Sequence, residues 1–262
     1  MTRLFAVTLT LLPALVLLPA LASAQTPEER GLQISVAAEK ANDGFKSETS
    51  EMAMILINSQ GDKTTRKMSS QSLEMSGDGD RSLITFKWPA DVKGTRMLTW
   101  SHKKKRDDQW LYLPSLRKVK RLSSRNKSGS FMGSEFAYED LASQEVEKYE
   151  DYFYMGDETI EGRKTQKIRR VPTDRKSGYS KQIVWMDPTY QSALKIEYYD
   201  RKGELLKTMT FSNFKKFGRY HRAGKINVVN HQTQKKSELS WTDRKLGADV
   251  DTSEFESEGL SE

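Results

Sequence analysis

The chain has 262 residues, a formal net charge of +7 at pH 7 and no cysteine. Its length suits one domain with a hydrophobic core, and the lack of cysteine excludes disulfides, thiol nucleophiles and thiolate metal ligands. The excess of positive charge favours an anionic partner, such as lipid headgroups, an acidic protein surface or nucleic acid.

The first 24 residues have the pattern of a cleaved signal peptide. Arg3 supplies a positive charge, residues 9–21 form a short apolar stretch, and Ala22-Ser23-Ala24 matches a small-residue cleavage site. We therefore expect an exported chain whose mature part begins at Gln25. A single membrane anchor is the alternative. It fits less well, because the stretch contains prolines and is shorter than the about 20 apolar residues that span a bilayer.

A helix is predicted directly after the cleavage site. Thr26 followed by Pro27 and two acidic residues is a helix start, and the Asn-Asp-Gly cluster at 42–44 ends it. Between them, Leu32 and Val36 fall on one face at helical spacing. The pattern indicates an amphipathic helix with these two side chains on its apolar face.

From residue 46 onward the pattern changes to strands separated by turn signals. The predicted strands cover residues 52–57, 64–76, 83–88, 95–102, 110–113, 119–122, 149–155, 166–171, 182–186, 193–199, 205–211, 226–231 and 238–241. Only 134–146 and 252–255 look helical in this part. Strands at this spacing are typical of an antiparallel sandwich or barrel.

The helix comes first and the strands follow as a meander, which favours a sheet curved around the helix. We predict a mainly β fold with a minor α component, in a single domain over residues 25–262. Its form would be an incomplete antiparallel β-barrel of about ten to twelve strands, curved around the N-terminal helix and a short helical lid.

Positive charge is concentrated between residues 103 and 127, a stretch that contains ten Lys and Arg residues but only two Asp residues. Residues 249–262 are acidic instead. The basic stretch is typical of a surface for anionic partners, although a solvated loop cluster remains the alternative. The run Lys103 to Arg106 has no role that the sequence reveals.

The most individual stretch follows this run. Trp110 and Tyr112 share one face of a strand, and residues 128–141 form a Gly- and Ser-containing loop with large apolar side chains. Four such side chains cannot all remain in water without forming an adhesive patch. Either they pack as ordinary core, or they form a movable lid over an apolar cavity, with Gly129 and Gly133 as hinges.

These residues also carry a family resemblance. The patterns W-x-Y-x-P-x-x-R-K-V-x-R, from Trp110, and F-M-G-S-x-F-x-Y-E-D-L, from Phe131, resemble the LolA-like outer membrane lipoprotein-sorting protein family. The strand end Trp88-Pro89 and the late strand 226–231 are similar too. The resemblance implies an incomplete antiparallel barrel over helices, a hydrophobic cavity for acyl chains and a place in the Gram-negative periplasm. Some relatives resemble partners of RND-type inner-membrane exporters.

The resulting hypothesis is a periplasmic carrier for lipoproteins or other acylated lipids, which passes them to envelope partners. The candidate cavity wall is Trp88, Trp100, Trp110 and Tyr112, with Leu111 and Leu113 as alternates; the cover is Phe131, Met132, Phe136 and Tyr138; the headgroup or partner contacts are Arg117, Lys118, Lys120 and Arg121. The alternative function is an accessory protein-binding module of an RND-type exporter or envelope assembly, without lipid carriage.

Signals for an enzyme are weak. His102, His221 and His231 show no metal-ligand spacing, and no G-x-S-x-G motif or phosphate loop exists. Glu135, Glu139 and Asp140 could form an acid–base pair, but such residues more often cap helices or pair with Lys and Arg. We expect no catalysis, cofactor, metal or nucleic-acid partner.

Overall fold

The computed structural model describes residues 25–123 and 126–261. The predicted signal peptide, residues 1–24, lies outside the described residues, as do Ser124, Arg125 and Glu262. Within the described part, no helix has the length and apolar character needed to cross a membrane.

The described chain contains one α-helix, α1 (Pro27–Asn42), and a long series of strands. The strands are β1 (Ser47–Ile57), β2 (Lys63–Leu73), β3 (Arg81–Trp88), β4 (Arg96–Trp100), β5 (Asp108–Leu113), β6 (Lys118–Arg121), β7 (Tyr149–Ile160), β8 (Arg163–Pro172), β9 (Tyr179–Asp187), β10 (Ser192–Asp200), β11 (Leu205–Ser212), β12 (Lys215–Phe217), β13 (Tyr220–Arg222), β14 (Lys225–Asn230) and β15 (Lys236–Leu246). Short 3-10 helices are η1 (Pro114–Leu116), η2 (Phe131–Gly133), η3 (Tyr138–Leu141), η4 (Val146–Lys148), η5 (Thr252–Phe255) and η6 (Glu258–Ser261).

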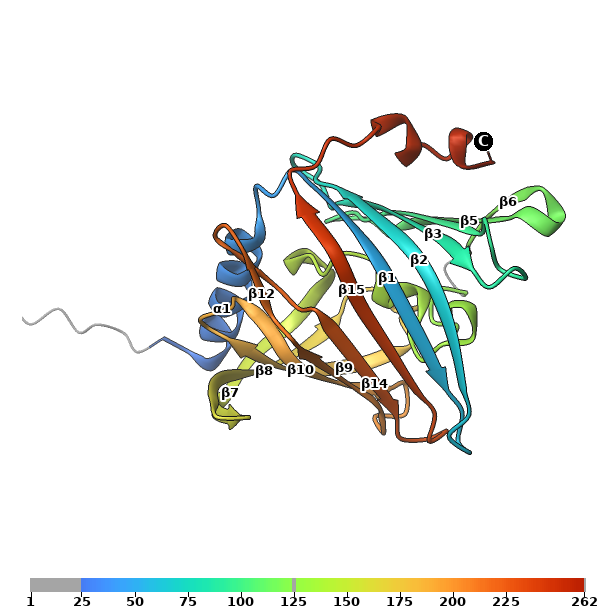
Figure 1. Cartoon of the computed structure of the whole chain (residues 1–262). Coiled ribbons are helices and arrows are strands. Elements are labelled where there is room, and N and C mark those ends of the chain that lie inside the picture. The colour runs from blue at the N-terminus through green and yellow to red at the C-terminus, as the bar shows by residue number, and fades with distance from the viewer. Residues whose placement is uncertain (1–24, 124–125, 262) are drawn as a thin grey trace, which may run out of the picture.

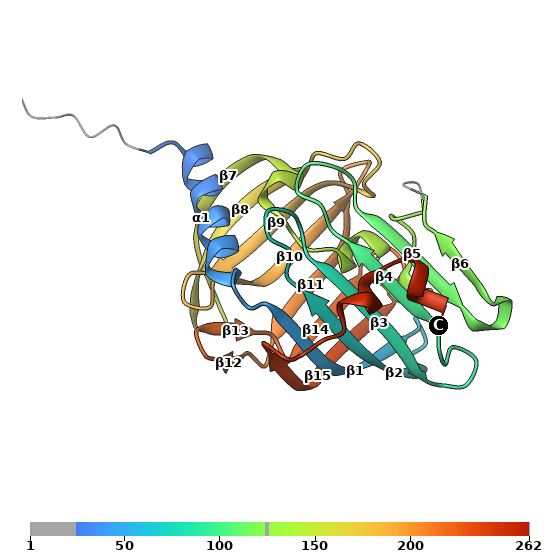
Figure 2. The same cartoon turned by 90° about the horizontal axis from the view of Figure 1, so that it is seen from above.

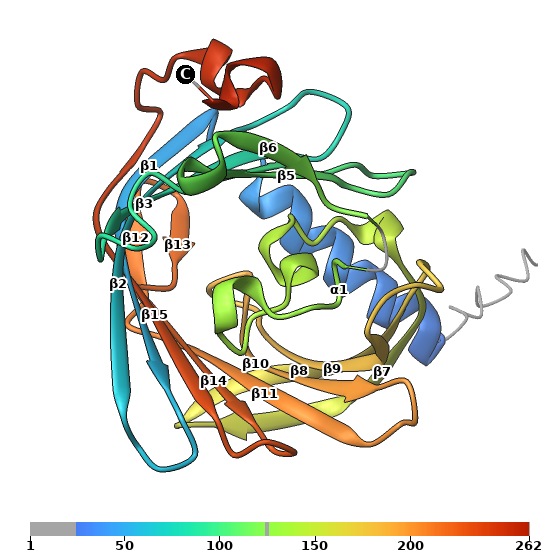
Figure 3. The ribbon, with the colours of Figure 1, turned by 90° about the vertical axis from the view of Figure 1, so that its right-hand side faces the viewer.

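Thirteen strands form one antiparallel sheet in the order β6-β5-β4-β3-β2-β1-β15-β14-β11-β10-β9-β8-β7, and β12 pairs with β13 separately. The sheet curls strongly, while its edge strands β6 and β7 stay apart (Figures 1 and 3). The predicted incomplete antiparallel barrel is confirmed, with 13 strands rather than ten to twelve. The β12–β13 hairpin was not predicted.

Helix α1 begins as predicted but buries a different face. The Thr26 hydroxyl accepts from the Glu29 amide at 3.2 Å, and the Glu29 carboxylate accepts from the Thr26 amide at 3.0 Å, which satisfies two free N–H groups of the first turn. The expectation for Leu32 and Val36 was wrong, because both are more than 40% exposed. The buried side instead carries small residues (Gly31, Ser35, Ala38) together with Ile34.

The close approach of α1 to β7 explains why the face with small residues is the buried one. A Cβ added at Gly31 would lie 2.9 Å from the backbone nitrogen of Phe153 in β7. A larger residue at that position would push the helix off the sheet, whereas small side chains let the two backbones meet. Helix α1 therefore packs along β7, at the end of the sheet farthest from β6 (Figure 3).

The concave side of the sheet is covered in part by the segment 128–141. Phe131 and Phe136 are 2% and 3% exposed and pack with Phe86 and Met209 in the main core. The Phe131 amide donates to the Phe136 carbonyl at 2.7 Å, so the segment folds back on itself as a compact turn. Figure 3 shows it inside the curve of the sheet.

A buried ion pair fixes this segment to the sheet. Lys207 of β11 contacts the Asp140 carboxylate at 2.5 Å, and each side chain is only 3% exposed. The same carboxylate accepts from the Tyr179 hydroxyl at 2.7 Å and from the Ala137 amide at 2.6 Å. Lys207 also donates to the Glu135 carbonyl at 3.0 Å. These contacts satisfy the buried charges and hold the turn in one position.

The convex side of β3, β4 and β5 is covered by the C-terminal segment (Figure 2). Phe255 and Leu260 are fully buried there against Leu83 and Leu98. The Trp100 indole N–H donates to the Phe255 carbonyl at 2.6 Å. Salt bridges from Arg81 and Arg96 to Glu256 and Glu254 add to the attachment. The acidic tail is thus a structural cover for one sheet face.

Breaking the buried pair should destabilise the fold. Lys207→Met leaves the Asp140 charge without its partner, which costs about 3–5 kcal/mol of unfolding free energy. Lys207→Met combined with Asp140→Asn should recover a large part of that loss, because no buried charge remains. Urea denaturation followed by circular dichroism measures both. Lys236→Met, at an exposed lysine of β15, is the control; equal midpoints for Lys207→Met and this control would contradict the role of the pair.

Candidate functional site

A cavity of about 1060 Å³ lies between α1, the sheet and the segment 141–146. Its volume lies just above the range of about 300–1,000 Å³ common for ligand pockets. Its apolar floor comes from neighbouring strands and the end of η3, and consists of Leu141, Val184, Met186, Ala193, Ile196 and Phe211.

Strand pairing places these floor residues side by side. Val184 of β9 pairs with Ile196 of β10, and Met186 pairs with Ala193. Alternate residues of a strand point to the same face, so each pair contributes to one continuous surface. The sequence analysis named none of these positions, although the alternation within residues 182–186 and 193–199 contained the signal.

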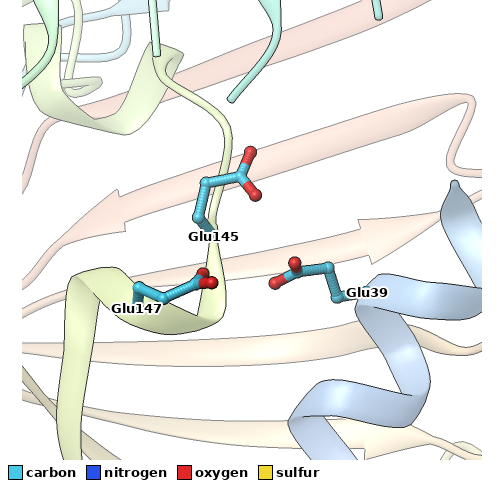
Figure 4. A group of neighbouring side chains, drawn as sticks. All are labelled: Glu39, Glu145 and Glu147. Carbon is cyan, nitrogen blue, oxygen red and sulfur yellow. The ribbon is translucent and has the colours of Figure 1, made fainter. Parts of the chain in front are cut away.

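The rim of the cavity is charged. Glu39 of α1 and Glu145 line it, and their carboxylates lie within 4.8 Å of one another and of the carboxylate of Glu147 in η4. Glu39 and Glu147 point toward each other in Figure 4. Such a group has the ligand type that a hard cation prefers. The Lys103 ammonium lies 2.8 Å from Glu39 and 3.8 Å from Glu145, so one positive charge offsets part of the negative charge of this cluster.

Burial and crowding of acids change the proton affinity of this rim. Burial raises the pKa of the Asp80 carboxyl to about 7, and the charge of Glu145 adds to the rise. Burial also raises the pKa of Glu145, and the nearby Glu39 contributes in the same direction. Both carboxyls hold protons more tightly than exposed ones do.

The structure corrects the predicted cavity wall. Trp100, Trp110 and Tyr112 lie on the convex face, packed with the C-terminal segment, and Trp88 is 50% exposed. None of the four lines the cavity between α1 and the sheet. The cause is strand alternation: Leu111 faces the concave core while its neighbours in β5 face outward.

The predicted cover does lie on the concave side, but as core. Phe131 and Phe136 are buried, and Met132 and Tyr138 pack partly buried against them. The ring centroids of Phe131 and Tyr138 are 5.6 Å apart, in an edge-to-face contact. None of these four side chains lines the cavity. The expected position over an open pocket was therefore wrong, and Leu141 alone of η3 reaches the cavity floor.

The predicted basic contacts form one exposed hairpin. Arg117, Lys118, Lys120 and Arg121 belong to the turn and edge strand after β5, and all are exposed. At the tip, Leu116 is 61% exposed. Arg121 pairs with Asp108, whereas no salt bridge of the other three occurs among the described residues. The structure brings this group together on the surface, and none of the four lines the cavity between α1 and the sheet.

The residues considered for catalysis have structural contacts. Glu139 accepts from the Ser177 hydroxyl at 2.7 Å and the Gly178 amide at 2.8 Å, and Asn230 donates to Glu135 at 2.6 Å. His102 is buried and lies between two carboxylates, with Nδ1 2.6 Å from Asp78 and Nε2 3.2 Å from Asp108. These bonds hold loops against the sheet.

Comparison with known proteins places the chain in a family. A family model described as an uncharacterized protein matches residues 78–262. A solved structure from Vibrio parahaemolyticus, described as an outer membrane lipoprotein-sorting protein domain, is 46% identical, with a TM-score of 0.87 over 90% of this chain and 100% of that one. The chain belongs to the LolA-like outer membrane lipoprotein-sorting protein family.

Two further structures extend this LolA-like relationship. A DUF1329 family protein from Desulfovibrio piger is 28% identical, with a TM-score of 0.85, over 90% of this chain and 99% of that one. A LolA superfamily protein from Nitrosomonas europaea shares the fold at 21% identity and a TM-score of 0.68, over 86% and 97% of the two chains. No curated protein matches the chain.

The raised pKa of Asp80 predicts a pH-dependent effect in this LolA-like chain. The folded state binds the Asp80 proton more tightly than the unfolded state does. The fold therefore loses stability as the pH rises from the unfolded-state pKa, near 4, to the folded-state pKa of about 7. Asp80→Asn removes that loss, so its melting temperature should exceed that of the wild type at pH 8 and approach it at pH 4. Thermal melts at both pH values, with the exposed Asp249→Asn as control, measure this. A variant less stable than the wild type at pH 8 would contradict it.

Proposed function

We propose that this chain is a periplasmic carrier that holds an acyl chain of a lipid or lipoprotein in the cavity between α1 and the sheet. The observation that carries the proposal is the cavity of about 1060 Å³ with a continuous apolar floor on β9, β10 and β11. Membership of a lipoprotein-sorting family supports it. The signal-peptide pattern of residues 1–24 supports export to the periplasm.

The energetics of acyl burial fit a carrier that must also release its cargo. Burial of one CH₂ group contributes about 0.8 kcal/mol, so a 16-carbon chain would gain on the order of 12 kcal/mol. Loss of translational freedom and ordering of the chain cost several kcal/mol. The remaining affinity suffices for retention in water and still allows transfer to an acceptor. No covalent step is needed.

Filling the cavity should abolish lipid uptake. Ala193→Trp places an indole among the floor residues of β9 and β10, so bound lipid in organic extracts and uptake of a fluorescent fatty acid should fall about tenfold or more. Thr210→Trp adds the same side chain at an exposed position of β11 and should bind as the wild type does. Mass spectrometry of the extracts and fluorescence titration give the readouts. Uptake that is equal in the two variants, or absent from the wild type, would refute carriage in this cavity.

The exposed basic hairpin favours a second candidate function, that of an accessory module binding an RND-type exporter or another envelope partner. Leu116 at its tip is 61% exposed and is followed by Arg117 and Lys118. An apolar residue within a cluster of unpaired basic residues is typical of an interaction surface. The same hairpin would serve a carrier during handover.

Charge reversal on this hairpin should weaken membrane association. Lys118→Glu with Lys120→Glu should reduce the fraction that co-sediments with Gram-negative inner-membrane vesicles several-fold at low salt, because attraction becomes repulsion. Lys63→Glu with Lys236→Glu makes the same charge change at exposed sites on β2 and β15. Equal losses in the two double variants would show an effect of net charge alone and exclude a specific hairpin contact.

A further inference from the structure

The basic run Lys103 to Arg106, which the sequence left without a role, is held in one conformation between β4 and β5. The Lys103 amide donates to Asp78 at 2.9 Å, and the His102 amide donates to Asp107 at 2.9 Å. Although burial alone would raise it, hydrogen bonds from His102 and from the Lys103 amide lower the pKa of Asp78 to about 2. The loop is therefore anchored at its base by the Asp78 and Asp107 side chains.

This loop borders a second cavity of about 420 Å³. Its walls come from the loop, the segment 139–149 and the turn between β8 and β9. Lysines gather on these walls: Lys103, Lys104, Lys105, Lys127, Lys148 and Lys176. Hydroxyl and amide groups, among them Tyr149 and Gln182, and several carboxyl groups also line it.

Several of these charges have no acidic partner. Among the described residues, no carboxylate lies within salt-bridge distance of Lys104, Lys105 or Lys176, while Arg106 pairs with Asp174 and Lys148 with Asp107. Lys127 donates to the main-chain oxygen of Asp107, and burial lowers its pKa. An anion in the cavity would stabilise the charge of each of these lysines.

The acids on the same walls are largely neutralised. Asp140 is paired with Lys207. Burial raises the pKa of Glu139 to about 7, although hydrogen bonds from Ser177 and Gly178 oppose the rise. Glu147 is exposed at the rim. The balance of charge in the cavity is positive.

A buried arginine on the wall of the larger cavity bonds to Gln144 and Gln182, which line this smaller one. Arg170 is 7% exposed, and its guanidinium donates to Gln182 and Gln144 at 2.9 Å each and lies 3.8 Å from the Tyr149 ring centroid. Within the described chain it has no carboxylate at salt-bridge distance. Buried charges are normally paired, because an uncompensated one is costly. Both amides present their oxygens to Arg170, since guanidinium only donates.

We propose that this cavity binds a phosphate-type anion. Lysines act as point charges that suit a multiply charged oxyanion, and Arg170 adds positive potential through the amides in front of it. The two sources of such an anion are a lipid headgroup and a free phosphate compound. The site shares Lys103, Ser143 and Gln144 with the larger cavity, so a headgroup bound here would lie next to an acyl chain bound there.

Titration calorimetry at low ionic strength tests the site in the purified chain. Inorganic phosphate and glycerol 3-phosphate are the free probes, and phosphatidylcholine vesicles with and without phosphatidylglycerol are the lipid probes. Binding of the free probes identifies a soluble phosphate ligand. Binding of the phosphatidylglycerol vesicles alone identifies a headgroup. A wild-type chain that binds none of these probes overturns the proposal.

Matched variants locate the binding. Lys104→Gln, Lys105→Gln and Lys176→Gln together should weaken it about tenfold or more. Arg117→Gln, Lys118→Gln and Lys120→Gln together remove the same charge from the exposed hairpin and should change it less than about twofold. Equal losses in the two triple variants would overturn the proposal, because diffuse attraction would then explain the binding.

A single change tests the role of Arg170 without removing it. Gln144→Glu supplies the carboxylate that Arg170 lacks, at an exposed position. Phosphate binding should fall about tenfold while the melting temperature stays equal or rises. Undiminished binding by Gln144→Glu would show that Arg170 does not contribute. Since no acyl chain is involved in these free-probe titrations, their failure would leave carriage in the larger cavity as it stands.

Discussion

Alternate side chains of a strand point to opposite faces of the sheet, and this alternation decides what each surface of the curved sheet can do. Strands β3, β4 and β5 carry apolar residues on both faces: Ile84 and Met97 point to the concave core, whereas Leu83 and Leu98 point to the convex side. Both faces must be removed from water. The chain meets this requirement with two separate covers, the turn at 128–141 inside and the C-terminal segment outside.

The inner cover also determines where a cavity can exist. Phe131 and Phe136 fill the concave side next to β3 with two large rings, and the pair formed by Lys207 and Asp140 fixes them there. Of this turn, only Leu141 lines the cavity together with the floor residues of β9 and β10. Helix α1, held close to β7 by Gly31, lies on the other side of the cavity from these floor residues. The cavity is therefore the portion of the concave face that lies between two fixed covers.

The sequence predicted the strands well, because each predicted segment overlaps one strand of the sheet. The sequence-based prediction was wrong where two faces of a helix or strand were both apolar enough to be buried, because tertiary packing then decides which face is covered. Leu32 and Val36 matched an amphipathic helix, but small residues on the other side of α1 allowed the close approach to β7. Trp110 and Tyr112 are apolar on an ordinary strand face, and only the position of the C-terminal segment, far away in sequence, shows that this face is the convex one.

The two cavities have opposite electrostatic character although they share a wall. The rim of the larger cavity near α1 carries Glu39, Glu145 and Asp80; burial raises the pKa of Asp80, and the charge of Glu145 adds to the rise. The smaller cavity is lined by lysines. Lys103 lines both cavities, and its salt bridge to Glu39 offsets part of the negative charge at the rim of the larger one. A cargo with an apolar chain and a phosphate headgroup would thus be repelled from one rim and attracted to the other, which gives the proposed carrier a single favourable orientation for its ligand.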